Sequence, residues 1–483
     1  MTCGLELVAI LLYHAFMSNK GFIVVLLVLS AVTHFAYFGN PDNVVFDEVW
    51  YGRHVNDYLR RTFHFDGHPP LGRMTVAGFA KIFDYQPVSP FATIGEPYPN
   101  SQYKILRFLP SLAGTLLPIV VFLIMQELGI RPLIAFTGAL LLAFDNGLVT
   151  QSRLLLMDAF LLLYGFTSFF FYLRYRNKGK AYLLLLAGIF SGLAVSVKWV
   201  GLSFVGLPIL VEGFAALMQI KDRGVRSLHP RRLLFTLVAL VVMPFAVYFG
   251  AVTAYLSLLN RSGTGDTFMS PEYQKTLKGN HYENQQQLPT PNLFGKFVEL
   301  NVQMYRVNQG LVATHPYASR WYTWPFMIRS IYYWVEENAK IYFLGNPLVW
   351  WSSTVAILYV VWLFTQGLWS ALRRSIQQSP VVSGTLVILC AGYFLNLLPY
   401  MGIKRIMFLY HYLSAFVFAV IIFTYLIDKN FGKAVDTNRR FKFAALGFVV
   451  LNIASFLYFA PLTYGLPVEN EKYEQRVWLK SWR

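Results

Sequence analysis

The stretch NPDNVVFDEVWYGRHVNDYLRRTFHFDGHPPLGR, residues 40–73, decides how the chain is interpreted, because it is a polar segment between two long apolar ones. It contains an adjacent acidic pair, Asp47 and Glu48, followed by a cluster of His64, Asp66 and His68. The chain as a whole has only 24 acidic residues among 483. Acidic side chains beside a bilayer are costly and usually have a chemical use, so this segment is predicted to carry the function.

Long apolar runs recur along the rest of the chain, which is 56% hydrophobic and 13% charged, about half the charged share of a typical soluble protein. Each run approaches the roughly 20 residues that cross a bilayer as a helix. We predict eleven spans, centred near residues 30, 115, 141, 163, 189, 209, 245, 353, 390, 417 and 453. Residues 1–19 are apolar but short, and either cross the membrane or lie along it. The expected fold class is an all-α polytopic membrane protein, with residues 1–483 as one membrane domain.

The distribution of basic residues predicts the orientation of these spans. The net charge is +17, but the cations gather in alternate loops, which argues against nucleic-acid binding. The clusters are Arg174, Arg176, Lys178 and Lys180; Lys221, Arg223, Arg226, Arg231 and Arg232; Arg373 and Arg374; and Lys429, Lys433, Arg439, Arg440 and Lys442. All four clusters fall on the same side of the eleven-span arrangement, and the positive-inside rule makes that side cytoplasmic. Residues 40–104, residues 260–340 and the C-terminal tail are therefore expected to face outward. The two cysteines, Cys3 and Cys390, give no disulfide framework.

The two large outer loops differ in character. In the first, residues 48–61 are predicted to form an interfacial helix, because one helical face gathers Tyr51, Val55, Tyr58 and Leu59. The second loop, residues 260–340, begins polar and then becomes the aromatic run THPYASRWYTWPFMIRSIYYW, residues 314–334. That run is either an aromatic belt at the membrane boundary or a platform for sugar rings, and both interpretations stay open.

Asp47 and Glu48 are the first candidates for chemistry. Two adjacent carboxylates repel when both ionise, so one of them is expected to have a raised pKa and to act as a general base near neutral pH. The alternative is structural: Asp47 caps the helix that follows, and Glu48 favours the positive end of the helix dipole. On sequence grounds the two interpretations have about equal weight.

The cluster of His64, Asp66 and His68 is the second candidate. Its residues are of metal-ligand types, but no further ligand set stands at a suitable spacing, so a metal site is the less favoured interpretation. Pro69 and Pro70 instead predict a rigid turn that aims one or two of these side chains. We expect neither a bound metal nor a cofactor.

Charges within or at the ends of the apolar spans form the third group, which consists of Arg107, Asp158, Lys198 and Arg405. Each is expected in the outer half of the membrane, where a buried charge needs a partner or a ligand. An arginine with a lysine there would suit a lipid-linked phosphate, through bidentate and point-charge contacts. The alternative is that Asp158 only neutralises Arg107 or Arg153. Tyr410 and His411 follow Arg405 closely along the chain.

Taken together, the motifs resemble the protein O-mannosyltransferase family. FDEVWYG followed by FDGHPPLGR resembles the first outer loop of that family. Further matching blocks are NGLVTQSRLLLMDAFLLLY, SVKWVGL, HPYASRWYTWPFMIR, LGNPLVWW, RIMFLYHYL and EQRVWLKSWR. The blocks follow in family order from about residue 46 to residue 483, so the resemblance covers nearly the whole chain.

The resemblance implies a GT-C-type glycosyltransferase with its site on the outer face of the membrane. Such enzymes take mannose from a polyprenyl or dolichyl phosphate and join it, with inversion, to Ser or Thr hydroxyls of exported proteins. It implies that Asp47 is the base and that Glu48 supports substrate placement, and that Arg107, with Lys198 or Arg405, holds the donor phosphate. The cleft that it implies is shaped by Asp66, His68, Asp158, His315, Arg320, Trp321, Tyr410 and His411.

The partners expected from this resemblance are a polyprenyl-phosphate sugar, a secreted or membrane protein acceptor, membrane lipids and the export machinery. The expected location is the plasma membrane, with the site on the extracytoplasmic face. A direct displacement needs one base and cations for the leaving phosphate, so a divalent metal is not obligatory.

Two departures from the family pattern stand out. Residues 260–340 are too few for the sugar-binding-like MIR module that many eukaryotic members carry in this loop, and this bears on the acceptor. Arg73 stands where the family usually has lysine, but both residues are cationic, so this departure is discounted. The alternative activity is therefore transfer to lipid A or another envelope lipid or glycan, with a different sugar. A transporter is disfavoured, because no internal repeat is evident and the acids lie in outer loops.

Overall fold

The computed structural model describes residues 18–224, 227–310, 314–372 and 383–483. Cys3, residues 1–17 and the basic residues Arg226, Arg373 and Arg374, which entered the predictions above, lie outside these ranges.

All eleven predicted centres fall within helices. These are α2 (Asn19–Phe35), α5 (Tyr103–Glu127), α6 (Pro132–Ala143), α8 (Asp158–Lys178), α9 (Ala181–Val197), α10 (Leu202–Arg223), α12 (Met243–Leu258), α15 (Pro347–Leu372), α16 (Gly384–Leu395), α17 (Leu413–Thr437) and α18 (Arg439–Tyr464). In the described ranges, seven stretches are long and apolar enough to cross a membrane, or eight if the bent pair of α6 and α7 (Asn146–Ser152) is one span. The multi-pass helical fold is thus confirmed. The count of eleven is not, because helices such as α2 and α9 have only 17 residues.

Helix α17 lies at the centre of this bundle. Every residue from 413 to 422 is buried, and α17 packs against α15, α16 and α6. A helix that is apolar on all sides is stable only when neighbours enclose it. Beside it, α5, α8, α9 and α12 pack in succession. The bundle therefore provides a rigid base for the polar segments at its ends.

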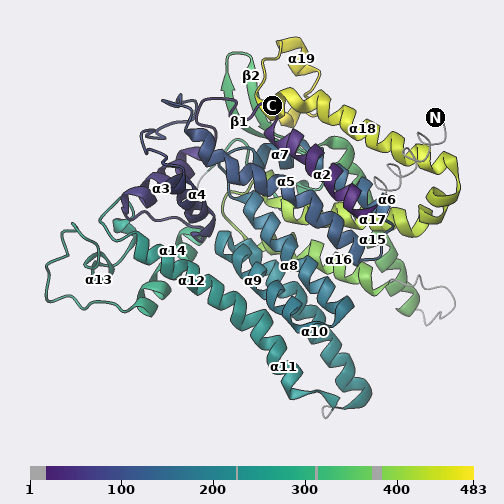
Figure 1. Cartoon of the computed structure of the whole chain (residues 1–483), viewed down its shortest axis with the longest axis horizontal. Coiled ribbons are helices and arrows are strands. Elements are labelled where there is room, and N and C mark those ends of the chain that lie inside the picture. Colours follow the sequence, from purple (N-terminus) through teal and green to yellow (C-terminus); the bar gives the residue numbers. More distant parts are fainter. Residues whose placement is uncertain (1–17, 225–226, 311–313, 373–382) are drawn as a thin grey trace, which may run out of the picture.

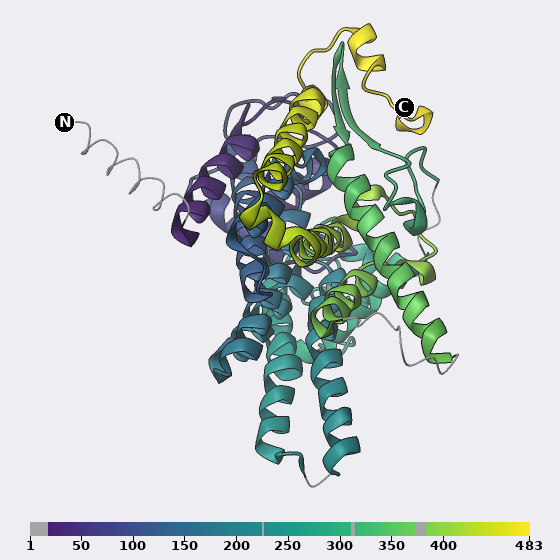
Figure 2. The same ribbon diagram turned by 90° about the vertical axis from the view of Figure 1, so that its right-hand side faces the viewer.

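Shorter elements extend the bundle. Before α10 comes η1 (Trp199–Gly201); before α12 come α11 (Pro230–Leu237) and the π-helix η3 (Val238–Val242); between α16 and α17 lie η6 (Leu398–Gly402) and η7 (Leu409–Tyr412). Figure 2 shows that the tip joining α10 to α11 extends far from the bundle, at the end opposite to the β-hairpin and α19. This tip carries one of the basic clusters of the sequence.

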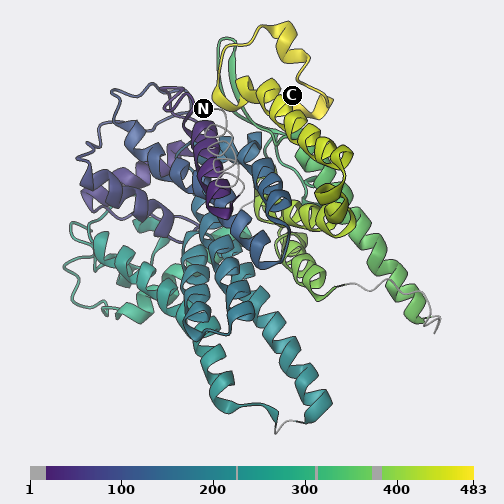
Figure 3. The same ribbon diagram turned by 45° about the vertical axis from the view of Figure 1, so that its right-hand side comes forward.

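The two outer loops lie side by side (Figures 1 and 3). The first forms α3 (Glu48–Arg60) and α4 (Leu71–Ile82), and the second forms η4 (Asp266–Phe268), α13 (Pro271–Gln274) and α14 (Leu293–Gly310). The Phe63 amide donates to the Arg261 carbonyl at 2.8 Å, and the Arg261 amide donates to the Arg61 carbonyl at 3.1 Å. A Cβ at Gly265 would lie only 2.4 Å from the Phe65 amide nitrogen, so glycine allows this close approach of the two backbones.

A β-hairpin that was not predicted completes the second loop. The aromatic run passes through η5 (Trp321–Thr323) into β1 (Ile331–Glu336), which pairs antiparallel with β2 (Ala339–Phe343). The C-terminal tail, with α19 (Asn470–Glu474) and η8 (Lys480–Trp482), docks on this loop. Trp482 is 2% exposed, and its indole donates to the Met327 carbonyl at 2.7 Å. The aromatic run is therefore largely a packing element that the tail secures.

The tail gives a first prediction. Trp482→Ala removes a buried indole and its hydrogen bond, and such truncations cost about 3–5 kcal/mol. We expect a correspondingly lower thermal unfolding midpoint in detergent. Trp478→Ala, in the same segment but 48% exposed, is the matched control and should change stability far less. Equal losses in the two variants would contradict this account of the tail.

Candidate active site

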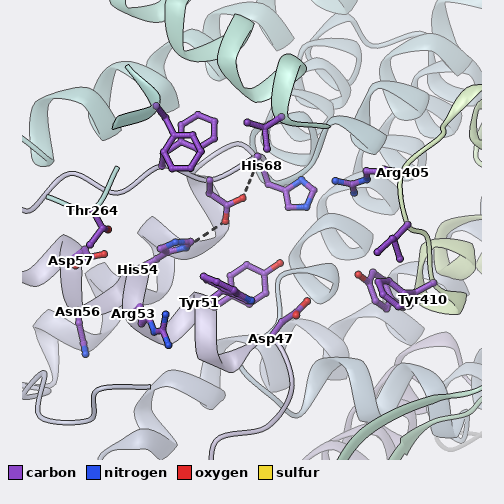
Figure 4. Close-up of a pocket in the computed structure, with 18 of the residues that line it drawn as sticks. Asp47, Tyr51, Arg53, His54, Asn56, Asp57, His68, Thr264, Arg405 and Tyr410 are labelled. Atoms are coloured by element: carbon purple, nitrogen blue, oxygen red, sulfur yellow. Dashed lines mark hydrogen bonds and ion pairs between the residues drawn. The ribbon is translucent and has the colours of Figure 1, made fainter. Parts of the chain in front are cut away.

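Two cavities meet at the start of α3. One, of about 660 Å³, lies beneath the outer loops, and the other, of about 380 Å³, extends between η1, α10, α14 and η6. Both are lined by Asp47, Tyr51, Gly67, His68, Arg405, Tyr410 and His411. In Figure 4, the first cavity has Asp47, His68, Arg405 and Tyr410 toward one end and Arg53, Asn56, Asp57 and Thr264 toward the other. The larger cavity is called the outer cavity below, and the smaller the membrane-side cavity.

Asp47 stands at the junction of the two cavities. It occupies the position before α3, as predicted, but its side chain accepts no capping hydrogen bond, and no described residue donates to it. Burial raises the pKa of Asp47 to about 6; the charge of Lys198 opposes this shift and that of Asp158 adds to it. The raised pKa thus has a different cause from the predicted repulsion by Glu48. The capping interpretation is wrong, and the carboxylate is left free for a substrate.

Phe46 sets the direction in which Asp47 leaves the backbone. Its φ of +48° lies in the left-handed region, which costs a non-glycine residue roughly 1–2 kcal/mol. The Phe46 ring stacks on Tyr333, with centroids 4.0 Å apart and planes 9° apart, and meets Tyr410 edge-on at 6.3 Å. These ring contacts hold the strained residue in place.

Glu48 and Arg107 form a buried ion pair that is closed to substrates. The Arg107 guanidinium donates to both Glu48 oxygens, at 2.8 and 2.7 Å, and its remaining N–H groups are taken by the carbonyls of Gly39, Pro41 and Asn43. Both side chains are at most 1% exposed. The structure therefore corrects two predictions: Arg107 has no N–H group left for a donor phosphate, and Glu48 is a structural partner that touches neither cavity.

Lys198 pairs with Asp158, with Nζ 2.8 Å from Oδ1. The Gln151 amide donates to the other Asp158 oxygen at 2.8 Å, and Nζ lies 5.4 Å from the centre of the Tyr410 ring. Asp158 thus neutralises Lys198, and the alternative that it neutralises Arg107 or Arg153 is wrong. Asp158 also lies behind Lys198 and lines neither cavity, so it does not shape the cleft directly.

Arg405 is the second cation at the membrane-side cavity. Its described contacts use one guanidinium nitrogen, which donates to the Asn308 side chain, and Asn308 in turn donates to the Gly67 carbonyl at 2.6 Å. Arg405 is partly exposed and lines both cavities. It therefore keeps N–H groups free, in contrast with Arg107.

The predicted histidine cluster is divided between separate environments. Asp66 pairs with Arg73 and lies 3.4 Å from His54, while the His64 ring stacks on the His54 ring at 4.2 Å. His68 lines both cavities, and burial, with help from the charges of Lys198 and Arg405, holds its pKa well below the ordinary value. Over the described ranges, no three or more His, Cys, Asp or Glu side chains are grouped so as to hold a metal ion.

Three residues predicted for the cleft lie elsewhere. His315, Arg320 and Trp321 line neither cavity. Their segment instead packs against the residues before η7, where the Ser319 amide donates to the Met407 carbonyl at 2.9 Å. His315 reaches the site only indirectly, through an edge-on contact with Phe408 at 5.1 Å. These three residues therefore lie away from the two cavities, whereas Asp66, His68, Tyr410 and His411 line the outer cavity.

Four further residues lie at or beside the site although the sequence did not mark them as site candidates. Tyr51 lies one helical turn after Asp47 and lines both cavities, so its spacing from Asp47 is a usable signal. Gln151, Asn308 and Tyr333 come from distant parts of the chain. Only the packing of α7, α14 and β1 brings them to the site.

The chain matches two family models. Residues 24–260 match the model described as dolichyl-phosphate-mannose-protein mannosyltransferase, and residues 293–482 match the C-terminal four-transmembrane region of protein O-mannosyltransferase. Among curated relatives, dolichyl-phosphate-mannose–protein mannosyltransferase 1 of Saccharomyces cerevisiae is 22% identical over 96% of this chain and 83% of its own length. Protein O-mannosyltransferase 1 of Drosophila melanogaster is 33% identical over 53% of this chain and 30% of its own. The chain thus spans most of the yeast relative but only about a third of others.

Solved structures share the fold. The Saccharomyces cerevisiae protein O-mannosyltransferase Pmt1-Pmt2 complex bound to the sugar donor contains a chain that superposes with a TM-score of 0.88 at 21% identity, covering 97% of this chain and 94% of that one. The apo oligosaccharyltransferase of Archaeoglobus fulgidus is more distant, with a TM-score of 0.51 at 13% identity over 95% of this chain and 57% of that one. These likenesses support the GT-C architecture.

The Glu48–Arg107 pair gives a second prediction. Removing one partner of a buried ion pair leaves an uncompensated charge and costs about 3–5 kcal/mol. We therefore expect Glu48→Gln to lower the thermal midpoint of the purified protein strongly. Asp47→Asn, one residue earlier, should unfold close to the wild-type temperature because Asp47 has no hydrogen-bond partner. A Glu48→Gln variant that is as stable as wild type but inactive would contradict this account and indicate that Glu48 has a catalytic role.

Proposed function

Because the chain belongs to the protein O-mannosyltransferase family, we propose that it transfers mannose from a polyprenyl-phosphate carrier to Ser or Thr hydroxyls of exported proteins. The observation that carries this proposal is the position of Asp47, an unpaired carboxylate at the junction of two cavities. One cavity suits the lipid-linked donor and the other suits the protein acceptor, so the base lies where the two substrates meet.

The proposed reaction is a single displacement. The Asp47 carboxylate takes the proton of the acceptor hydroxyl as that oxygen bonds to C1 of the mannose, and the bond from C1 to the phosphate oxygen breaks. The phosphate oxygen keeps the electron pair of the broken bond, and the phosphate leaves while still attached to its lipid carrier. The anomeric centre is inverted. This scheme needs no covalent nucleophile, so one free carboxylate at the junction is sufficient.

Lys198 and Arg405 are proposed to hold the donor phosphate. Both line the membrane-side cavity, and each retains N–H groups that its described partners do not use. Positive groups placed where negative charge develops lower the barrier most in a site sheltered from water. The apolar wall of that cavity, which includes Trp199, Leu202 and Leu395, suits the first isoprene units of the carrier. With two cations available, the scheme requires no divalent metal.

The outer cavity is proposed to receive the acceptor segment. It is open at its rim, where Trp50 is 57% exposed, and it is lined by Asp66, His68 and Tyr410 near Asp47. The low pKa of His68 keeps its imidazole neutral, so it can share hydrogen bonds with sugar or peptide groups without repelling the nearby cations. Arg53 instead braces the wall, because it donates to the carbonyls of Phe91 and Ala92.

The proposed location is the plasma membrane, with the site on the extracytoplasmic face. The basic clusters at the tip between α10 and α11 and between α17 and α18 support this orientation by the positive-inside rule. Membrane lipids would surround the bundle, and the acceptor would reach the outer cavity as it leaves the export machinery.

The direct test is transfer of radiolabelled mannose from polyprenyl-phosphate-mannose to a Ser/Thr-rich exported peptide. Purified wild type should transfer the label. The transfer rate of Asp47→Asn should be at least about 100-fold lower, which is the lower end of the range for loss of a general base. The thermal midpoint of each sample shows whether it is folded. Donor consumption only with envelope lipids or glycans would refute the protein acceptor, and full activity of folded Asp47→Asn would refute the base.

A pH profile gives a further prediction. Asp47 acts as a base only when ionised, and its pKa of about 6 means that the ionised fraction falls as the pH drops below 6. We expect kcat/KM to decline about tenfold per pH unit on the acid side of that value. The residual activity of Asp47→Asn should lack this decline. An acid limb near the ordinary pKa of an aspartate would contradict the buried position of the base.

A further inference from the structure

A continuous series of contacts runs from Lys198 back to the residue before Asp47. From Lys198 it passes to Asp158 at 2.8 Å, then to the Gln151 amide at 2.8 Å. The Tyr333 hydroxyl donates to the Gln151 carbonyl oxygen at 2.5 Å, and the Tyr333 ring stacks on Phe46 at 4.0 Å. The series starts at Lys198, between α9 and η1, passes through α8, α7 and β1, and ends at Phe46, just before α3.

Every hydrogen bond in this series has one direction. Asp158 can only accept while ionised, so the Gln151 amide group must face it, and the Gln151 carbonyl oxygen is then turned toward Tyr333. Gln151 is 3% exposed and Tyr333 is 1% exposed, and buried networks of this kind are rigid when every member is satisfied. The position of Lys198 at one end of the series is therefore coupled to the position of Tyr333 at the other.

We propose that Tyr333 and Gln151 are positioning residues that hold the base and the donor-phosphate cation at a fixed separation. This inference rests on the proposed function. The Tyr333 ring holds the left-handed backbone of Phe46, and through it the direction of Asp47. The Tyr333 hydroxyl orients Gln151, which orients Asp158 and so Lys198. Productive displacement needs both groups placed against one sugar, and such placement is a large part of catalysis.

The neighbouring Tyr332 shows what an ordinary packing tyrosine does in the same strand. Its ring contacts Tyr317 at 6.0 Å and Tyr342 at 4.9 Å, and it has no part in the series above. If Tyr333 only filled the core, its hydroxyl would be dispensable and the two tyrosines would be equivalent. Tyr332→Leu is therefore the matched control for Tyr333→Leu.

The experiment compares the steady-state kinetics of five variants with those of wild type, using polyprenyl-phosphate-mannose and the peptide. Tyr333→Phe keeps the ring and loses the hydroxyl; we expect it to raise the donor KM about fivefold, as Gln151→Met should. The double variant should be no worse than either one, because both changes break one series. Tyr333→Leu also removes the ring and should lower kcat by a further factor of about 10. Tyr332→Leu should leave both constants within about twofold of wild type.

The outcomes separate this inference from the proposed function. If wild type transfers mannose but Tyr333→Phe and Gln151→Met have wild-type donor KM, or if the two changes are additive, the coupling is refuted. If Tyr333→Leu loses no more kcat than Tyr332→Leu at equal thermal midpoints, the positioning of Asp47 is refuted. If wild type itself transfers no mannose from this donor, the proposed function fails first.

Discussion

The buried ion pair between Glu48 and Arg107 determines where everything else in the site lies. Glu48 reaches from the first turn of α3 into the bundle, where Arg107 of α5 and the backbone amides of Val45 and Leu155 donate to it. Burying two charges is costly, and the cost is offset only when both partners have all their hydrogen bonds. Here they do, so the first outer loop is fastened to the membrane helices at the residue beside Asp47.

This fastening explains how two adjacent acids come to have different roles. Glu48 points inward and has several donors, whereas Asp47 points into the junction of the two cavities and has none. The same division applies to the cations. All N–H groups of the Arg107 guanidinium already donate hydrogen bonds, whereas Lys198 and Arg405 retain unused N–H groups at the membrane-side cavity. The role of a charged residue here follows from how many of its hydrogen-bonding groups the fold has already used.

The membrane gives this arrangement its form. The proposed lipid-linked donor would present its phosphate at the bilayer surface, which fits the position of the two cations at the ends of helices, beside η1 and before η7. The proposed acceptor would arrive from water, which fits an outer cavity that is walled by loops. Side-by-side packing of the two outer loops, with Gly263 and Gly265 against the backbone of residues 63–65, closes the wall between them.

The amino-acid sequence by itself determined the helical membrane fold and the family, and it singled out Asp47 as the candidate base, since hydrophobic length and a few short motifs are local properties. It also predicted His68 and Tyr410 in the cleft and Arg405 beside the donor phosphate, and all three line the two cavities that meet at Asp47. Tertiary structure alone decided that Arg107 pairs with Glu48, that Asp158 pairs with Lys198, and that the aromatic run leads into a β-hairpin and lines neither cavity. Charge pairing depends on which side chains meet after the helices pack, and residues 48 and 107 or 158 and 198 meet only then. No spacing along the chain encodes those encounters.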